Sequence, residues 1–151
     1  MSKTTFAKTP PVFFQRLREV TEAYFTENNL RKTGDGRLYW KTAILMTALV
    51  GLYTVLVFFT PENGWLSLGL CTLLGLVMAS IGFNVMHDGA HGSYSRRNWV
   101  NEMMGHSLNM LGGSVHYWKA KHNVNHHTFT NIEGMDEDID IKFFMRVHKG
   151  Q

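Results

Sequence analysis

The chain has 151 residues, of which 44% are hydrophobic, 18% charged and 13% aromatic, and its formal charge at pH 7 is +3. The aromatic content and the long apolar runs exclude a disordered chain. The single cysteine excludes a disulfide framework, and so small and scattered a positive charge does not indicate nucleic acid as a partner. Eight histidines are many for this length, and seven of them lie between His87 and His127.

Residues 1–40 predict a cytoplasmic N-terminal segment with one amphipathic helix. We expect no secretory signal here, because no apolar stretch follows the first basic residues. Phe13, Leu17, Val20 and Tyr24 recur at helical spacing, and charged side chains fill the other face. Such a helix lies on a membrane surface or packs on the protein as an ordinary surface helix, and the sequence leaves both readings open.

Two uncharged stretches follow and predict a transmembrane helical hairpin over residues 41–86. They cover about 42–60 and 65–86, which is 19 and 22 residues. As helices they would reach roughly 28 and 33 Å, and the hydrocarbon core of a bilayer is about 30 Å thick. The alternative is a buried helical pair in a soluble protein.

The basic residues predict the orientation of this hairpin. The turn between the two stretches has no Lys or Arg, whereas basic side chains lie close to the other ends of both: Arg31, Lys32, Arg37, Lys41, Arg96 and Arg97. Basic loops stay on the cytoplasmic side. We therefore expect both termini, and every histidine, to be cytoplasmic.

Residues 87–151 predict a cytoplasmic metal-binding region. Apolar residues at helical spacing over 98–111 indicate a helix at the membrane interface, which Gly112 and Gly113 end. Ser114 is placed to cap a further helix that carries the second group of histidines. The fold class predicted for the chain is thus all-α and integral to the membrane.

The histidines come in two groups with metal-ligand spacing. His87 and His91 are four residues apart, as are His122 and His126, with His127 next to them. Two imidazoles at i and i+4 on a helix lie on one face and can share a metal. An all-nitrogen donor set suits Fe, Zn, Cu or Ni. We expect the remaining histidines to be polar surface residues: His106, His116 and His148.

Acidic and amide side chains near these groups could orient the imidazoles by accepting or relaying their second N–H. The candidates are Asp88, Asn123, Asn125, Asn131, Asp136, Asp138 and Asp140. The acidic run 136–140 also begins like a calcium-binding loop. It fails that pattern, because Ile141 replaces the required Gly and Val147 the required Glu.

These motifs resemble the membrane fatty acid desaturase family. HDGAH followed by GSYS resembles the first histidine box of that family, and WKAKHNVNHHTFTNIEGMDEDIDI resembles the second. FFQRLREVTEAYFTENN resembles bacterial members of the linoleoyl-CoA, or front-end, branch. The third box and the second hairpin of the family are not found, so the chain resembles the N-terminal portion of a longer enzyme.

The resemblance implies a non-haem di-iron centre that uses O2 to introduce a double bond into a fatty acyl chain. By position in the boxes it implies five metal ligands: His87, His91, His122, His126 and His127. It further implies an acyl-CoA or acyl-lipid substrate, and cytochrome b5 or ferredoxin with its reductase as electron donor. The bacterial inner membrane is the expected location. With five of the family's ligands, the 151-residue chain is expected to be inactive alone.

Two other functions are weighed against desaturation. A related di-iron membrane hydroxylase, acting on alkanes or lipids, also uses three histidine boxes, although the sequences that flank the boxes here favour the desaturase. A non-enzymatic membrane protein that binds or transports metal usually has ionisable ligands inside its spans. The stretch 42–86 contains Glu62, in the turn, as its only charged residue and has no histidine.

Overall fold

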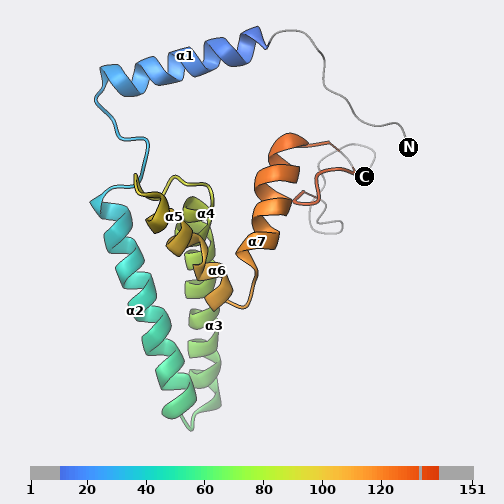
Figure 1. Cartoon of the computed structure of the whole chain (residues 1–151). Helices are drawn as coiled ribbons and strands as arrows, with labels where there is room; N and C mark the ends of the chain where they lie inside the picture. The colour runs from blue at the N-terminus through green and yellow to red at the C-terminus, as the bar shows by residue number, and fades with distance from the viewer. Residues whose placement is uncertain (1–10, 133, 140–151) are drawn as a thin grey trace. The chain divides into compact units, whose positions relative to one another are not determined.

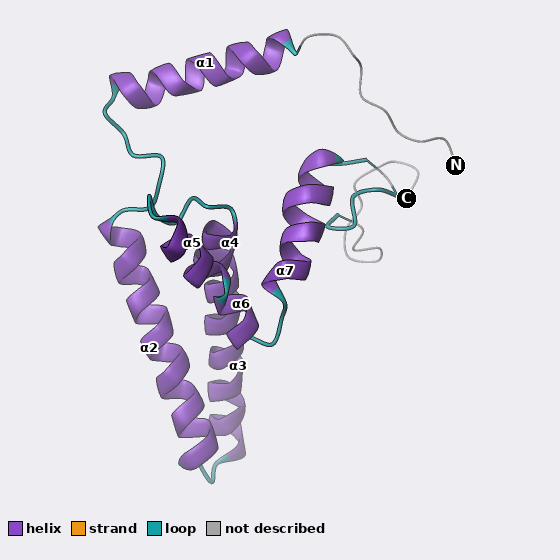
Figure 2. Ribbon diagram, in the orientation of Figure 1, coloured by secondary structure: helices purple, strands orange, loops and turns teal. Residues whose placement is uncertain are grey.

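The computed structural model describes residues 11–132 and 134–139, and the regular secondary structure of these residues is helical throughout (Figure 1, Figure 2). The chain divides into two compact units between Lys32 and Thr33. All-α structure is therefore confirmed for the part of the chain that is described.

The first unit contains α1, Val12–Glu27, which has no buried residue. The helix ends at Asn28, whose side chain donates to the Tyr24 carbonyl at 2.8 Å. Asn29 then turns the chain with a positive φ of 49°, a conformation that asparagine adopts more readily than most residues. This turn brings the Lys32 ammonium back to the helix, where it forms an ion pair with Glu22. The helix predicted from the apolar spacing is confirmed.

The second unit begins with α2, Gly36–Phe58, and α3, Gly64–Ile81. Each helix has an Asx cap, because the Asp35 carboxylate accepts from Arg37 N–H and the Asn63 side chain accepts from Trp65 N–H, both at 2.9 Å. Such caps satisfy backbone donors that a helix start leaves free. The Asp35 cap lets α2 begin before the uncharged stretch that starts at residue 42.

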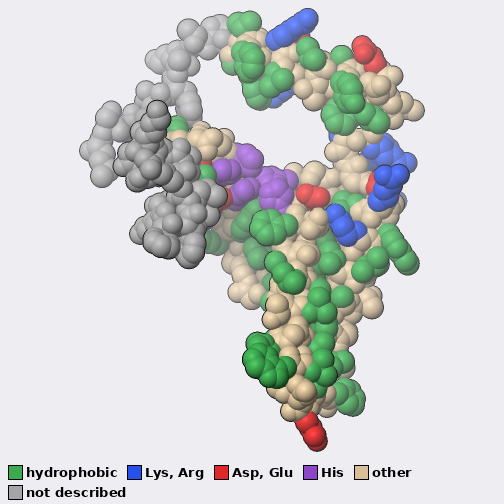
Figure 3. All heavy atoms as spheres, turned by 180° about the vertical axis from the view of Figure 1, so that it is seen from behind, with side chains coloured by type: hydrophobic (Ala, Val, Ile, Leu, Met, Phe, Trp, Pro, Cys, Tyr) green, Lys and Arg blue, Asp and Glu red, His purple; other side chains and the backbone are tan. Residues whose placement is uncertain are grey.

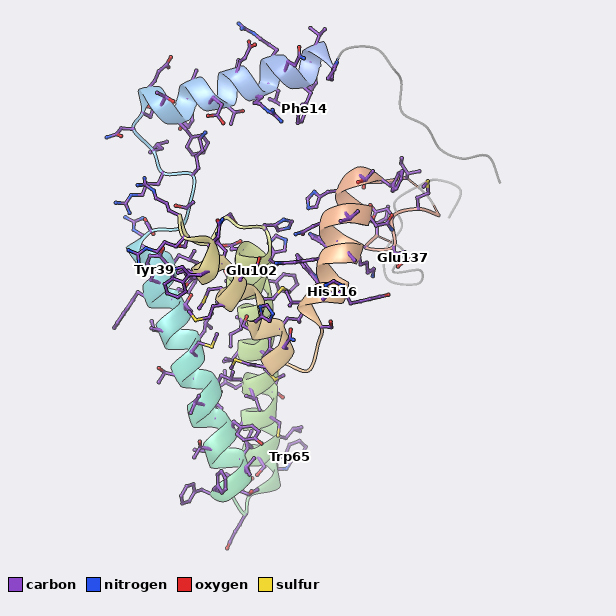
Figure 4. All side chains as sticks on the ribbon, in the orientation of Figure 1. Phe14, Tyr39, Trp65, Glu102, His116 and Glu137 are labelled. Carbon is purple, nitrogen blue, oxygen red and sulfur yellow. The ribbon has the colours of Figure 1, made fainter. Side chains whose placement is uncertain are left out.

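Helices α2 and α3 pack side by side and run in opposite directions, with Tyr39 near the start of α2 and Trp65 at the start of α3 (Figure 1, Figure 4). Both helical rods are long and apolar enough to cross a membrane, over Gly36–Phe58 and Gly64–Ala90. Only 6% and 11% of their most apolar windows are buried inside the protein. A core helix of a soluble protein is mostly buried instead.

The rod of α3 continues past Ile81 without interruption. A π-helical segment, η1, covers Gly82–Met86, and α4 covers His87–Ala90. The His87 N–H donates to the Gly82 carbonyl, which is the i→i+5 pattern of a π-helix. The first pair of histidines is therefore set on the end of the long helix and follows directly on a π turn.

A small apolar core supports this end of α3. Val77, Ile81 and Val85 are buried together with Tyr94, which comes from the loop after α4. The Tyr94 hydroxyl donates to the Thr42 hydroxyl of α2 at 2.7 Å. The core thus holds the start of α2, the end of α3 and the turn after the first histidines together.

The helix predicted over 98–111 is divided in two. It forms α5, Asn98–Gly105, and α6, Ser107–Met110, which meet at His106. α5 packs tightly on α4, because a Cβ added to Gly89 would lie 2.5 Å from the Gly105 nitrogen. Gly112 then takes a φ of +89° in the turn after α6, a conformation in which glycine has no steric penalty.

The last described helix carries the second group of histidines. It begins as α7, Val115–Trp118, and continues as a second π-helical segment, η2, Lys119–His126. The predicted Ser114 cap is confirmed, since its hydroxyl accepts from Tyr117 N–H at 3.4 Å. The Lys119 ammonium donates to Glu102 of α5 at 2.8 Å, which ties this helix to the rest of the unit.

Candidate metal centre

Five histidine side chains from two separate segments meet in one cluster, which forms a single patch in the space-filling view (Figure 3). Within the first segment, the ring centroids of His87 and His91 are 4.4 Å apart. Between the segments, His122 lies 5.3 Å from His87, and His127 lies 5.0 Å from His91. His126 stacks on His122 at 4.9 Å.

The ring nitrogens of these residues are close enough to share metal ions. One atom each of His87, His91 and His122 lie within 4.8 Å of one another, and so do atoms of His122, His126 and Asp138. His122 belongs to both groups and stands between the two parts of the cluster. A neutral imidazole nitrogen is a good ligand for iron, zinc or copper.

Two carboxylates hold the rings of the second segment. Asp138 Oδ2 lies 2.5 Å from Nδ1 of His122, and Asp136 Oδ1 lies 2.8 Å from Nδ1 of His126. An ionised carboxylate can only accept, so in both pairs Nδ1 carries the proton and donates. The lone pair of each ring is therefore on Nε2, and this is the arrangement in which carboxylates orient metal-binding histidines.

Asp136 is the buried anchor of this arrangement, with 2% of its surface exposed. Its carboxylate also accepts the backbone N–H groups of Asn131 at 2.9 Å and Asp138 at 3.1 Å. Burial by itself raises the pKa of Asp136, but the hydrogen bonds from His126 and from these two backbone groups outweigh it, and the pKa is lowered. The group stays ionised at neutral pH.

The other predicted orienting residues have different contacts. Asp88 Oδ1 lies 3.6 Å from Nδ1 of His87, which is an ion-pair distance and not a hydrogen bond. The Asn123 amide donates to the Ala90 carbonyl at 2.9 Å and so joins the two histidine segments. The Asn125 amide donates to the Met135 carbonyl at 3.0 Å and closes the acidic loop. Asn131 contributes its backbone N–H, which donates a hydrogen bond to the Asp136 carboxylate.

The surroundings of two imidazoles in the cluster, those of His91 and His127, favour the neutral form. The pKa of His91 is lowered from 6.5 to about 4, first because burial disfavours the charged ring and then because His87, His122 and His127 lie near it. The pKa of His127 is lowered for the same two kinds of reason. Neutral imidazole is the form that binds a metal, so these rings need not lose a proton first.

Trp118 belongs to this cluster, although the sequence did not single it out. Its ring stacks on His122 with centroids 4.4 Å apart, and it meets His87 and His91 edge-on at 5.6 Å each. The signal was available, because Trp118 precedes His122 by four residues and so shares a helix face with it. Trp118 forms one wall of the site.

The histidines expected to be surface residues lie apart from the cluster where the structure describes them. His106 is exposed, and its Nδ1 lies 2.7 Å from the Glu102 carbonyl. His116 is exposed on α7 (Figure 4). Among the described residues, neither histidine belongs to a group whose ligand atoms are close enough together to hold a metal ion. Asp140 and His148 lie outside the described residues.

The cluster defines a class of protein: an all-α chain with two long apolar helices and a histidine-rich centre at one end of them. The family model for fatty acid desaturases matches residues 63–150, which include both groups of histidines. The chain belongs to the fatty acid desaturase family, as the histidine boxes predicted.

Individual relatives agree with this assignment. The chain is 40% identical to an sn-1 linoleoyl-lipid 6-desaturase of Arthrospira platensis over 138 residues, which are 91% of this chain and 37% of the relative. It is 34% identical to an enzyme of the same name from Synechocystis sp., over 84% of this chain and 35% of the relative. An acyl-lipid (8-3)-desaturase of Physcomitrium patens is 31% identical, over 86% of this chain and 27% of the relative.

The chain therefore spans little more than a third, or less, of the length of these relatives. No solved structure matches it.

Proposed function

We propose that this chain is part of a membrane-bound, O2-dependent acyl-lipid desaturase, to which it contributes five histidine ligands of a di-iron centre. The observation that carries the proposal is the meeting of His87 and His91 with His122, His126 and His127 in one cluster. The family of the chain supports iron over the other metals that accept nitrogen ligands.

The ring nitrogens of these histidines are suitable ligands for iron. Carboxylates hold Nδ1 of His122 and His126, so their Nε2 lone pairs are available to a metal. His91 is neutral because its pKa is about 4. Asp138 already binds His122 and Lys121, which favours an orienting role for it over a ligand role. Iron bound to these nitrogens would supply the O2 activation that removal of two hydrogens from an acyl chain requires.

The protein's own groups do the positioning. The buried Asp136 fixes the acidic loop through two backbone N–H groups and at the same time holds the ring of His126. Asn123 fixes the distance between the two histidine segments through the Ala90 carbonyl. Trp118 packs against three of the rings and restricts their rotation.

The proposal places a hairpin of residues 41–86 across the membrane, which includes α3 and the part of α2 that follows Trp40. Their low burial supports this, since lipid would cover the apolar surface that the protein leaves exposed. The Lys41 ammonium binds Asn84 at 2.8 Å, so the basic start of α2 and the histidine end of α3 lie at the same end of the pair. By the positive-inside rule this end is cytoplasmic.

The names of the relatives support a fatty acyl chain on a lipid as the substrate. A centre at the cytoplasmic end of a hairpin could meet acyl chains from the bilayer and a soluble or peripheral electron donor. Cytochrome b5, or ferredoxin with its reductase, would fill that role. Residues 87–151 are proposed as the cytoplasmic metal-binding region. Residues 1–40 are proposed as a cytoplasmic segment that precedes the hairpin.

A chimera tests the proposal. This chain replaces the matching segment of the Arthrospira platensis relative, and the fatty acids of a host without its own desaturase are profiled. We expect a new double bond, which His122→Ala, His126→Ala or His127→Ala abolishes together with bound iron. His116→Ala is the matched control, because it removes an exposed histidine outside the cluster.

The products and the iron content separate the outcomes. Hydroxylated fatty acids without a double bond would replace the desaturase by the hydroxylase alternative. Near-normal double-bond formation and iron content in a cluster variant would remove that histidine from the ligand set. The 151-residue chain without the remainder is expected to form no double bond, because five histidines leave a di-iron centre short of ligands.

A further inference from the structure

Helix α1 has an apolar face that none of the described residues of its own unit, 11–32, covers. The face consists of residues spaced three or four apart, so that they lie on one side of the helix. Phe13, Leu17 and Tyr24 are 81%, 50% and 57% exposed, and Phe14 projects from the helix beside them (Figure 4). A face of this size needs a partner, which can be a protein surface or a lipid surface.

The charges around the face indicate which partner it is. Arg16 follows Phe13 by three residues and precedes Val20 by four, so it borders one edge of the apolar face. Arg18 borders the other edge, and its guanidinium lies 5.2 Å from the centre of the Phe14 ring. Both arginines therefore lie beside aromatic or aliphatic groups at the borders of the apolar face.

Two of the three acidic side chains of the helix occupy the opposite side, and the third, Glu27, is the last residue of the helix. Glu19 and Glu22 are three residues apart and face away from Phe13 and Leu17. Arg16 makes an exposed pair with Glu19 at 3.1 Å, and such pairs contribute little and exchange readily. Beyond the end of the helix, the Lys32 ammonium lies 5.9 Å from the centre of the Phe25 ring.

Cations at both edges of an apolar face, with Glu19 and Glu22 opposite, match the layers of a membrane interface. The apolar residues reach the acyl boundary, the long basic side chains extend back to the phosphates, and the acidic groups face water. A protein surface that covered the same face would have to bury the apolar stems of Arg16 and Arg18 and offer acceptors at both edges.

The connection to α2 keeps α1 near that interface. Residues 28–35 separate the end of α1 from the start of α2 at Gly36. Eight residues span at most about 28 Å when extended. If α2 crosses the membrane, α1 is tethered within that distance of the surface, and the tether raises its effective concentration there.

We propose that α1 lies flat in the cytoplasmic leaflet, with its apolar face in the acyl boundary and with Arg16 and Arg18 on lipid phosphates. This proposal rests on the membrane placement of α2 and α3 made above, and it concerns a surface separate from the metal centre. It makes α1 a lipid-binding element of the chain.

The experiment uses single-cysteine forms of the whole chain, reconstituted in phospholipid vesicles and labelled with an environment-sensitive fluorophore. The native Cys71, exposed on α3, reports on the membrane placement itself. In a Cys71→Ser background, Leu17→Cys reports on the apolar face and Gln15→Cys on the polar face two residues away. Each label is quenched in turn by lipids brominated on the acyl chain and by aqueous iodide.

We expect brominated lipid to quench Cys71 and the Leu17→Cys label, and iodide to quench the Gln15→Cys label severalfold more than the other two. A Leu17→Cys label that iodide reaches as readily as Gln15→Cys would overturn the proposal. A Leu17→Cys label shielded from both quenchers would also overturn it, in favour of a protein surface. If brominated lipid does not quench the Cys71 label, the membrane placement of α3 is contradicted. That result is distinct from a failure of the proposal for α1.

Discussion

The hydroxyl of Tyr94 donates a hydrogen bond of 2.7 Å to the hydroxyl of Thr42, across 52 residues of sequence, and both side chains are buried. The Thr42 hydroxyl donates in turn to the Leu38 carbonyl at 3.0 Å. Tyr94 follows His91 by three residues, so this bond connects the first pair of histidines to the start of α2.

Removing this bond is expected to destabilise the fold in a way that a double-mutant cycle resolves. Tyr94→Phe loses one buried hydrogen bond, at a cost of about 1 kcal/mol. Thr42→Val leaves the Tyr94 hydroxyl buried without its acceptor and costs about 1–3 kcal/mol. The double variant is expected to lose less than the sum, because the two groups interact. Unfolding in detergent followed by circular dichroism measures each cost, and simple additivity would mean that the bond contributes nothing.

Gly89 is expected to tolerate no side chain. A Cβ there would lie 2.5 Å from the Gly105 nitrogen and 2.8 Å from the Asn101 carbonyl oxygen, both backbone atoms. Gly89→Ala should therefore cost about 1–3 kcal/mol of stability by forcing α4 and α5 apart. Gly75→Ala is the matched control, since a Cβ there meets nothing within 4 Å and helix propensity favours Ala by up to about 1 kcal/mol. Equal melting temperatures for the two variants would contradict the close packing.

The acidic loop is expected to set metal affinity without supplying a ligand. Asp136→Asn and Asp138→Asn weaken the hold on Nδ1 of His126 and His122. Loss of such an orienting group lowers metal affinity about 10- to 100-fold. Titration of the chain with Co2+ or Fe2+ against a chelator measures the change. Glu137→Gln, at an exposed position in the same loop, is the control, and unchanged affinity in the Asp136 variant would remove it from this role.

The lowered pKa of His91 predicts how stability responds to acid. Burial and the neighbouring histidines lower this pKa from 6.5 to about 4. Between these two values the unfolded chain takes up a proton at His91 that the folded chain does not. The contribution of His91 to stability therefore falls as the pH drops from 6.5 toward 4, and it is constant above 6.5.

Nuclear magnetic resonance of labelled histidine should give a titration midpoint for His91 near 4 in the metal-free chain. Denaturation at pH 7 and pH 5 should show a smaller acid-induced loss for His91→Gln than for the unaltered chain. A His91 midpoint near 6.5, the ordinary value, would mean that the cluster is more open to water than the structure shows.

Sequence periodicity predicted the local features well. The helix of residues 12–27, the two long apolar helices and the Ser114 cap all depend on side chains within a few positions of one another, where spacing fixes geometry. The position of His91 beside His127 depends on the packing of α4, α5 and η2, and no local pattern encodes it. The sequence offered seven side chains that could orient the imidazoles. Among the six that the structure describes, Asp136 and Asp138 accept hydrogen bonds from ring nitrogens.

The helix ends were less predictable. The segment 98–111 reads as one apolar stripe, yet the backbone breaks at His106, where the ring turns back to the Glu102 carbonyl. Trp118 was not predicted, because its contacts with His87 and His91 join segments that are about 30 residues apart in the sequence. The two π-helical segments have no sequence signal that distinguishes them from α-helix.

The π-helical segment Gly82–Met86 acts as a one-residue insertion in an otherwise α-helical rod, because each π turn holds one residue more than an α turn. If the same five residues were α-helical instead, with none removed, His87 and His91 would turn by about 100° around the rod relative to α3. Their rings would then leave the side that faces Trp118 and His122. The π-helical geometry of this segment therefore sets the rotational phase of the first histidine pair.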